Sequence, residues 1–137
     1  MSFHKIRSAL VEAFESGGFA MPVVYENDDS YEPNADTPYF RFYFLSNIPV
    51  PVTMGAIGED EVISIAQFEM NYPLNQGTGN SWTKADDMRQ VFKAGAKFIH
   101  DGQEVLIRRS GVTREPKEVN GFSQSIFTIQ YSARIPR

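Results

Sequence analysis

The spacing of apolar residues along the chain predicts two helices. From Phe3 to Phe14 apolar side chains recur every three or four positions, the period of an amphipathic helix, and Gly17-Gly18 supplies its end. A second helix is predicted to begin at Thr83, where a Thr-x-x-Asp pattern forms a cap. Its predicted buried stripe comprises Ala85, Met88, Phe92 and Gly95.

Short runs of apolar and aromatic residues bounded by turn residues predict strands over residues 21–27, 37–46, 62–73 and 122–135. A hairpin over residues 97–109 is predicted from its Asp101-Gly102 turn. Apolar positions change parity after Ile65, so a bulge or a change of packing partner is expected near Ala66. The polar segment 110–121 is expected to be a loop.

This order of elements predicts the fold class. It is an α+β domain with a largely antiparallel or mixed β-sheet and two helices packed on one face. The 137 residues have the length of a single domain, so one domain is expected over residues 1–137.

The strand "TPYFRFYFLS" at residues 37–46 has two different faces. Its three phenylalanines share one face, which is a core face, whereas Tyr39, Arg41, Tyr43 and Leu45 share the other. Tyrosine and arginine are enriched at protein interfaces because they combine large contact area with hydrogen bonds. This face is predicted either to contact another protein or to lie under the chain's own loops.

The segment Asn47–Glu61 combines chain breaks with apolar side chains. Pro49, Pro51 and Gly55 prevent a regular central strand. Its apolar residues are Ile48, Val50, Val52, Met54 and Ile57. A long apolar loop requires a surface to cover it.

The composition excludes several classes of protein. Because the chain has no cysteine, a disulfide, a thiolate nucleophile and a cysteine-based zinc site are excluded. No apolar run approaches the roughly 20 residues that span a bilayer, and the N-terminus has no long apolar segment of a signal peptide. The chain is therefore expected to remain in the cytoplasm where it is made, without a membrane partner.

Charge is distributed unevenly around a net value of −4. Residues 1–83 contain 3 Lys+Arg against 11 Asp+Glu, whereas residues 84–137 contain 10 against 6. Such an acidic total is not typical of a nucleic-acid reader. An acidic surface of one copy could meet a basic surface of the next and favour head-to-tail association, or the charges could mix once the chain folds.

The sequence offers few candidate groups for catalysis, metal binding or phosphate binding. His4 and His100 are far apart and have no partner at metal-ligand spacing. The acidic groups Asp28-Asp29, Glu59–Glu61 and Asp86-Asp87 fall in loops or at a helix start, where acids favour solubility and the helix dipole. Residues 75–84 lack the third glycine of a dinucleotide fingerprint and the Gly-Lys-Ser/Thr of a P-loop. No catalytic group, metal site or cofactor is expected.

Arg108, Arg109, Arg114 and Lys117 form the only basic cluster in the sequence. Such a cluster is typical of a solvated loop face. It could also contact another subunit or the phosphates of DNA.

Five segments together resemble a known family. They are "IRSALVEAF", "TPYFRFYFL", "SIAQFEMNYPLNQGTG", "ADDMRQVFKAGAKF" and "FSQSIFTIQYSARI". In their order along the chain and in their local sequences, they resemble the tail terminator proteins of long, non-contractile-tailed, lambda-like bacteriophages. The resemblance covers nearly the whole chain and contains no catalytic signature.

The resemblance implies a structural virion protein of a phage or prophage, not an enzyme. Such a protein forms a hexameric ring that caps the tail tube, ends tube polymerisation and forms the head-tail joining surface. It is made in the host bacterial cytoplasm and resides at the head-proximal end of the virion tail. Its implied partners are further copies of itself, the tail tube protein and a head completion or connector protein, while DNA passes through an acidic lumen without specific binding.

Under this resemblance, three surfaces are expected to form the interface. They are the Tyr-Arg-Tyr face of residues 37–46, the apolar segment Asn47–Glu61 and the basic cluster. The residues are Tyr39, Arg41, Tyr43, Val50, Val52, Met54, Ile57, Arg108, Arg109 and Arg114. Two other functions stay open. One is another head-tail junction protein, and the other is a small-ligand-binding or enzymatic α+β domain whose aromatic strand lines a pocket.

Overall fold

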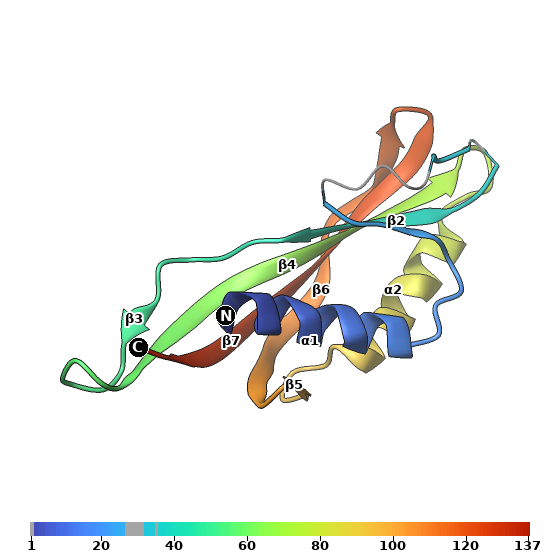
Figure 1. Cartoon of the computed structure of the whole chain (residues 1–137). Helices are drawn as coiled ribbons and strands as arrows, with labels where there is room; N and C mark the ends of the chain where they lie inside the picture. The colour runs from blue at the N-terminus through green and yellow to red at the C-terminus, as the bar shows by residue number, and fades with distance from the viewer. Residues whose placement is uncertain (1, 27–31, 35) are drawn as a thin grey trace.

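The structure, a computed structural model, describes residues 2–26, 32–34 and 36–137 (Figure 1). The helices are α1 (Ser2–Ser16) and α2 (Gly79–Val91). The strands are β1 (Val23–Val24), β2 (Tyr39–Phe44), β3 (Val50–Pro51), β4 (Glu59–Pro73), β5 (Lys97–His100), β6 (Gln103–Val119) and β7 (Phe122–Pro136). Among the described residues, no helix is long and apolar enough to cross a membrane.

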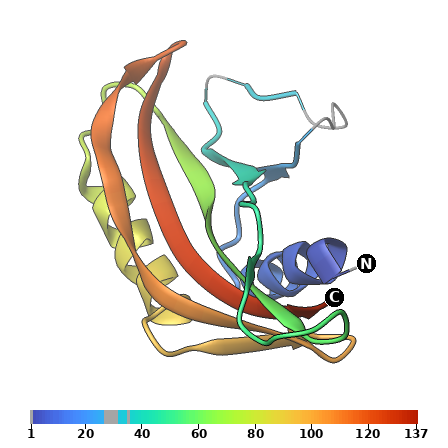
Figure 2. The same ribbon diagram turned by 90° about the vertical axis from the view of Figure 1, so that its left-hand side faces the viewer.

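The strands form one mixed sheet in the order β1-β2-β4-β7-β6-β5, with β3 paired to β4. Only the β1–β2 pair is parallel among the described strands, and the other pairs are antiparallel. The long strands β4, β7 and β6 curl together, as Figure 2 shows. This architecture confirms the predicted α+β fold.

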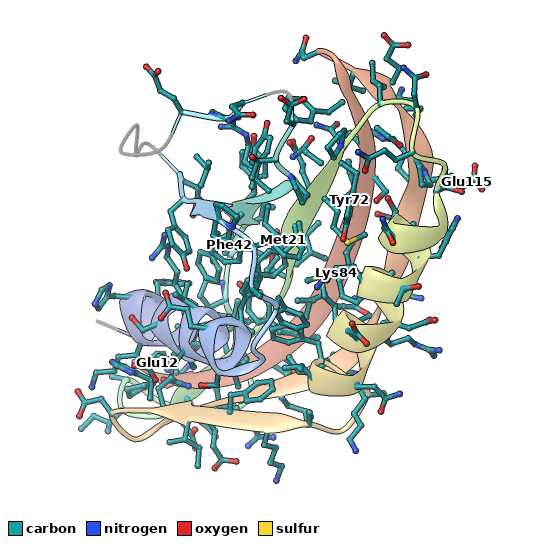
Figure 3. The ribbon with its side chains drawn as sticks, turned by 90° about the vertical axis from the view of Figure 1, so that its right-hand side faces the viewer. Glu12, Met21, Phe42, Tyr72, Lys84 and Glu115 are labelled. Atoms are coloured by element: carbon teal, nitrogen blue, oxygen red, sulfur yellow. The ribbon has the colours of Figure 1, made fainter. Side chains whose placement is uncertain are left out.

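Both helices pack against one face of the curled sheet, which we call the core face (Figure 3). Phe68 of β4 lies at its centre. The ring of Phe14 in α1 stacks on Phe68 with centroids 4.4 Å apart, and that of Phe92, directly after α2, lies 6.2 Å away. One apolar core therefore joins both helices to the sheet. The opposite face of the sheet, which we call the second face, carries Tyr39, Arg41 and Tyr43 of β2.

Two tight turns set the long hairpins. The predicted Asp101-Gly102 turn is confirmed, with φ values of 49° and 81° that suit a type I′ turn. The predicted loop at 110–121 is wrong, because β6 continues to Val119 and turns into β7 through Asn120-Gly121. That turn has the same left-handed geometry, with φ values of 51° and 82°.

Three local predictions are corrected. The second helix begins at Gly79, with Thr78 as an N-cap that makes no side-chain cap bond, and Gly95 lies in an exposed turn beyond the helix. The strand predicted at 21–27 is confined to Val23–Val24 among the residues described. The bulge near Ala66 is absent, since β4 pairs with β7 without a register shift over its full length. The alternative, a change of partner, agrees with the other edge of β4, where pairing with β2 ends at Ala66 and β3 pairs with Asp60 and Glu61.

Candidate functional site

A polar hollow of about 500 Å³ lies on the second face, where β2, β4 and β7 run side by side. Strand register explains why distant residues meet there, because Tyr39 pairs with Asn71 and Asn71 with Gln124, while Arg41 pairs with Glu69. The lining includes Tyr39, Arg41, Tyr43, Glu69, Asn71, Phe122 and Gln124. The predicted Tyr-Arg-Tyr face thus forms one wall of a larger site.

Hydrogen bonds connect the floor of the polar hollow across the sheet. The Gln124 side-chain amide donates to Oε2 of Glu69 at 3.1 Å and to Oδ1 of Asn71 at 2.9 Å. Nη2 of Arg114 in β6 donates to Oε1, the side-chain oxygen of Gln124. Arg41 lies with Nε 3.9 Å from Oε2 of Glu69. Four strands therefore contribute to one charged network with two cations and one carboxylate.

Two donors in this network have no partner in the described part of the chain. They are Nδ2 of Asn71, a residue only 1% exposed, and Nε of Arg114. Buried polar groups in native proteins are normally hydrogen-bonded, and an unpaired one costs roughly 1–3 kcal/mol. Both atoms are themselves buried, so the groups open to a partner are the partly exposed Arg41 and Tyr43 side chains that line the hollow.

The three β2 side chains differ in their environment. Tyr39 is buried, with its ring 5.2 Å from that of Phe122. The Arg41 guanidinium lies 6.0 Å from the Tyr39 ring centroid, so Tyr39 helps to position that cation. Tyr43 is 36% exposed, and burial together with the charge of Glu69 raises its pKa. Its hydroxyl group therefore stays protonated at neutral pH and can donate a hydrogen bond.

The segment Asn47–Glu61, which we call the arm, exposes its apolar side chains. The exposed fractions are 88% for Ile48, 62% for Val50, 41% for Val52, 96% for Met54 and 93% for Ile57. The expected loop is partly a β-ribbon, because Val50 pairs with Glu61 and Pro51 with Asp60. On the adjoining second face, Ile63 and Leu45 extend the apolar surface, which explains the change of parity along β4.

Arg137 holds the arm in one shape. Its Nη2 donates to the backbone carbonyl of Thr53 at 2.5 Å and to Oγ1 of Thr53 at 3.0 Å, and its Nη1 lies 3.4 Å from Oδ1 of Asp60. Oγ1 of Thr53 also accepts a bond from the backbone N–H of Glu59 at 2.7 Å. The arm is therefore a defined element, and sequence reasoning missed its clamp because Arg137 is 84 residues away from Thr53.

The structure separates the arginines of the sequence cluster along β6. Arg108 lines another hollow, of about 590 Å³, with Glu61, Lys97 and Glu104. Arg109 donates from Nε to Oε1 of Gln130 at 2.9 Å, and Arg114 belongs to the polar hollow. These arginines therefore do not form a single basic patch.

The remaining candidate groups are dispersed. His100 lies with Nδ1 2.7 Å from Oε1 of Glu12, and His4 is exposed elsewhere on α1. Asp28 and Asp29 lie outside the described residues. Within the described ranges, no three His, Asp or Glu side chains are grouped to hold a metal ion.

Comparison with known proteins gives a family. No curated protein matches the chain. One solved protein chain, whose name carries no description of function, is 18% identical over 93% of this chain and 94% of its own, with a TM-score of 0.69, and supports the fold alone. The family model for the phage tail terminator protein matches residues 5–131. The chain therefore belongs to the phage tail terminator family and is a structural component of a phage tail.

Proposed function

We propose that this chain assembles into a hexameric ring that caps the tail tube and ends its polymerisation. One surface of the ring binds the last ring of tube protein and the other meets a head completion or connector protein. DNA passes through the lumen without specific binding. Family membership supports this role, and the proposal treats the chain as one domain that performs no chemistry.

The exposed arm is the observation that carries the proposal. Met54 and Ile57 are almost fully exposed, although each could bury a large apolar surface. Contiguous exposed apolar patches on soluble proteins mark protein contacts, and the fixed shape given by Arg137 reduces the conformational entropy lost on binding. We assign the arm to contact with a neighbouring subunit in the ring or with the tube.

The polar hollow supplies the second part of the proposed interface. Arg41 and Tyr43 are partly exposed at the polar hollow, and both side chains can donate hydrogen bonds. A polar group from a neighbouring protein would pair with these donors and give specificity to the contact. Arg108 and Arg109 are assigned to the same interface at separate points along β6.

A different head-tail junction role is the second candidate. Connector and head completion proteins are also small and form rings. In such a role, the apolar arm of this chain would contact the head instead of the tube. Binding to the tail tube separates the two roles. The polar hollow also keeps a ligand-binding function testable, because its volume would admit a small molecule.

The test is to add the purified protein to tails assembled in a lysate that lacks it. We expect electron micrographs to show tubes of uniform length with a ring of density at one end. Continued lengthening of the tubes, without the protein joining them, would overturn the terminator role. Binding to heads alone would favour the connector role.

A matched pair of variants makes this test specific. Arg41→Ala removes a cation from the mouth of the polar hollow, whereas Glu115→Ala removes an exposed charge on β6 outside it. We expect Arg41→Ala to need a higher concentration for capping and Glu115→Ala to act as the wild type. Equal behaviour of the two variants would remove the polar hollow from the interface.

A further inference from the structure

A small hollow of about 180 Å³, which we call the basic hollow, lies between the end of α2 and β6. Three of its six lining residues are cations and none is an acid. The lining consists of Arg89, Gln90, Lys93, Ala94, Arg109 and Ser110. None of these residues lines the polar hollow or belongs to the arm, so the basic hollow is a separate surface.

The three cations of the basic hollow have no charged partner. Arg89, Lys93 and Arg109 are all exposed, and none of them forms an ion pair with a described residue. Arg109 donates from Nε to Oε1 of Gln130 at 2.9 Å. That bond fixes the guanidinium through an uncharged group and leaves its positive charge uncompensated.

The helix itself compensates only a small part of this charge. A helix dipole is equivalent to roughly half a negative charge at the C-terminal end, which favours a cation such as Arg89 in the last turn of α2. Half a charge does not balance three cations. Asp86 and Asp87, about one turn earlier on α2, form no ion pair with Arg89. The basic hollow is therefore a local positive site on a chain of net charge −4.

Hydrogen bonds hold the walls of the basic hollow in place. Oγ of Ser110 in β6 donates to the backbone carbonyl of Phe92 at 2.6 Å, and Phe92 is fully buried in the core. The backbone N–H of Ala96 donates to the carbonyl of Lys93 at 3.0 Å and closes the turn after α2. The backbone that carries the cations is thus fixed before any partner binds, which lowers the cost of binding.

The surroundings of the basic hollow favour a single carboxylate over a nucleic acid. A duplex presents a phosphate about every 1.7 Å and requires a basic stripe, which an acidic chain with scattered cations does not provide. The neighbouring arginines on β6 already lie near acids, since Arg108 lines a hollow with Glu61 and Glu104. A hollow of this small volume matches one Asp or Glu side chain. Arginine forms strong hydrogen bonds of the charge-assisted kind with such a group.

We infer that the basic hollow binds a carboxylate from an acidic segment of a neighbouring protein in the assembled tail. Arg109, held by Gln130, donates to the carboxylate oxygens, while Arg89 and Lys93 supply further positive charge. This inference rests on the proposed function. It gives the assignment of Arg109 to the interface a chemical partner and adds two cations from α2.

Zero-length crosslinking of capped tails tests the contact on the wild-type protein. A carbodiimide joins a lysine amine directly to a carboxylate that touches it, and mass spectrometry identifies the joined peptides. We expect Lys93 to be linked to an Asp or Glu of another chain, either the tube protein or a second copy. Rings mixed from isotope-labelled and unlabelled protein separate links between copies from links within one chain. Lys117, exposed on β6 outside the lining of the basic hollow, is the internal control.

The crosslinking result decides the inference because it needs no variant that must fold. If tails are capped and Lys93 is linked to no other chain, or no more than Lys117, the inference is wrong while the proposed function stands. If the wild-type protein does not cap tails, the proposed function itself fails.

Charge reversal gives an independent readout. Lys93→Glu places a carboxylate inside the basic hollow, and Lys117→Glu makes the same change of net charge outside it. We expect Lys93→Glu to raise the capping midpoint about tenfold, and Lys93→Arg and Lys117→Glu to act as the wild type. Both lysines are exposed, so the fold is expected to tolerate these changes, and urea unfolding checks this.

Two outcomes of the charge reversal would overturn the inference. One is an equal capping midpoint for Lys93→Glu and Lys117→Glu. The other is binding of a labelled DNA duplex by the wild-type protein that Lys93→Glu abolishes, since the hollow would then take phosphate instead of a protein carboxylate.

Discussion

Replacing the apolar tip of the arm should abolish capping without weakening the fold. The variant Met54→Ser/Ile57→Ser changes two side chains that are 96% and 93% exposed. Neither contributes to the core, so the free energy of unfolding should change by no more than about 0.5 kcal/mol. An effect on capping would then belong to the interface.

The expected size of that effect follows from burial. Complete burial of a Met or an Ile side chain contributes about 1.5–3 kcal/mol, so docking of both contributes roughly 3–6 kcal/mol per contact. Each 1.4 kcal/mol corresponds to about a tenfold change in affinity. We therefore expect the protein concentration for half-maximal capping to rise by at least ~100-fold.

The assay is tail length against concentration of added protein, scored by electron microscopy. Trp82→Ser is the matched control, because it removes a large exposed side chain from α2 instead of from the arm. Urea unfolding of both variants checks that the fold is intact. A capping midpoint within about threefold of the wild type would refute the assignment of the arm to an interface.

Three further changes test the fold and the arm. Phe68→Ala removes the ring between the two helices, and we expect urea unfolding to show a loss of about 4 kcal/mol in a single transition; two transitions would contradict one domain. Tyr131→Phe removes the hydroxyl that donates to the Leu45 carbonyl at 2.7 Å. Burial raises the pKa of Tyr131 to about 12, so its contribution to stability should be complete below pH ~10 and lost as the pH rises toward 12; a pH-independent difference between variant and wild type would refute this. Gly58→Ala places a Cβ against Oγ1 of Thr53, so hydrogen exchange should quicken in the arm while the core stays protected, and unchanged exchange there would refute the close packing.

The sequence predicted those helices, strands and turns whose formation depends on residues close together in the chain. The first helix, the phenylalanine strand and the Asp101-Gly102 hairpin follow from periodicity and turn preference. The second half of β6 was missed because it is polar on both sides and contains Pro116, which normally ends strands. Pro116 is tolerated because it falls at a register irregularity, between Arg114 and Lys117. The Asn120-Gly121 pair was the available signal for that hairpin.

The parts of the candidate site were predicted less completely than the fold. Alternation placed Tyr39, Arg41 and Tyr43 on one face, which strand β2 confirms. Their partners could not be derived, because Gln124 meets Asn71 only through the pairing of β4 with β7, 53 residues apart. The closeness of Arg108, Arg109 and Arg114 in the sequence suggested one basic patch. A strand places the neighbours Arg108 and Arg109 on opposite faces, and register shifts in β6 separate them from Arg114.

The arm and the polar hollow have different physical roles in the proposed assembly. A protein that must remain soluble before it meets its partner cannot expose a broad apolar sheet, and here the most exposed apolar side chains lie on a narrow arm that ends in the acidic residues Glu59–Glu61. Apolar burial by the arm gives affinity with little selectivity, since any apolar groove would accept it. The polar hollow adds selectivity, because a partner that covers Arg41 without offering an acceptor leaves a charged donor unpaired, while a matching partner pairs with it. Loss of the arm should therefore weaken capping of every tube, whereas changes in the polar hollow should alter which tubes are capped.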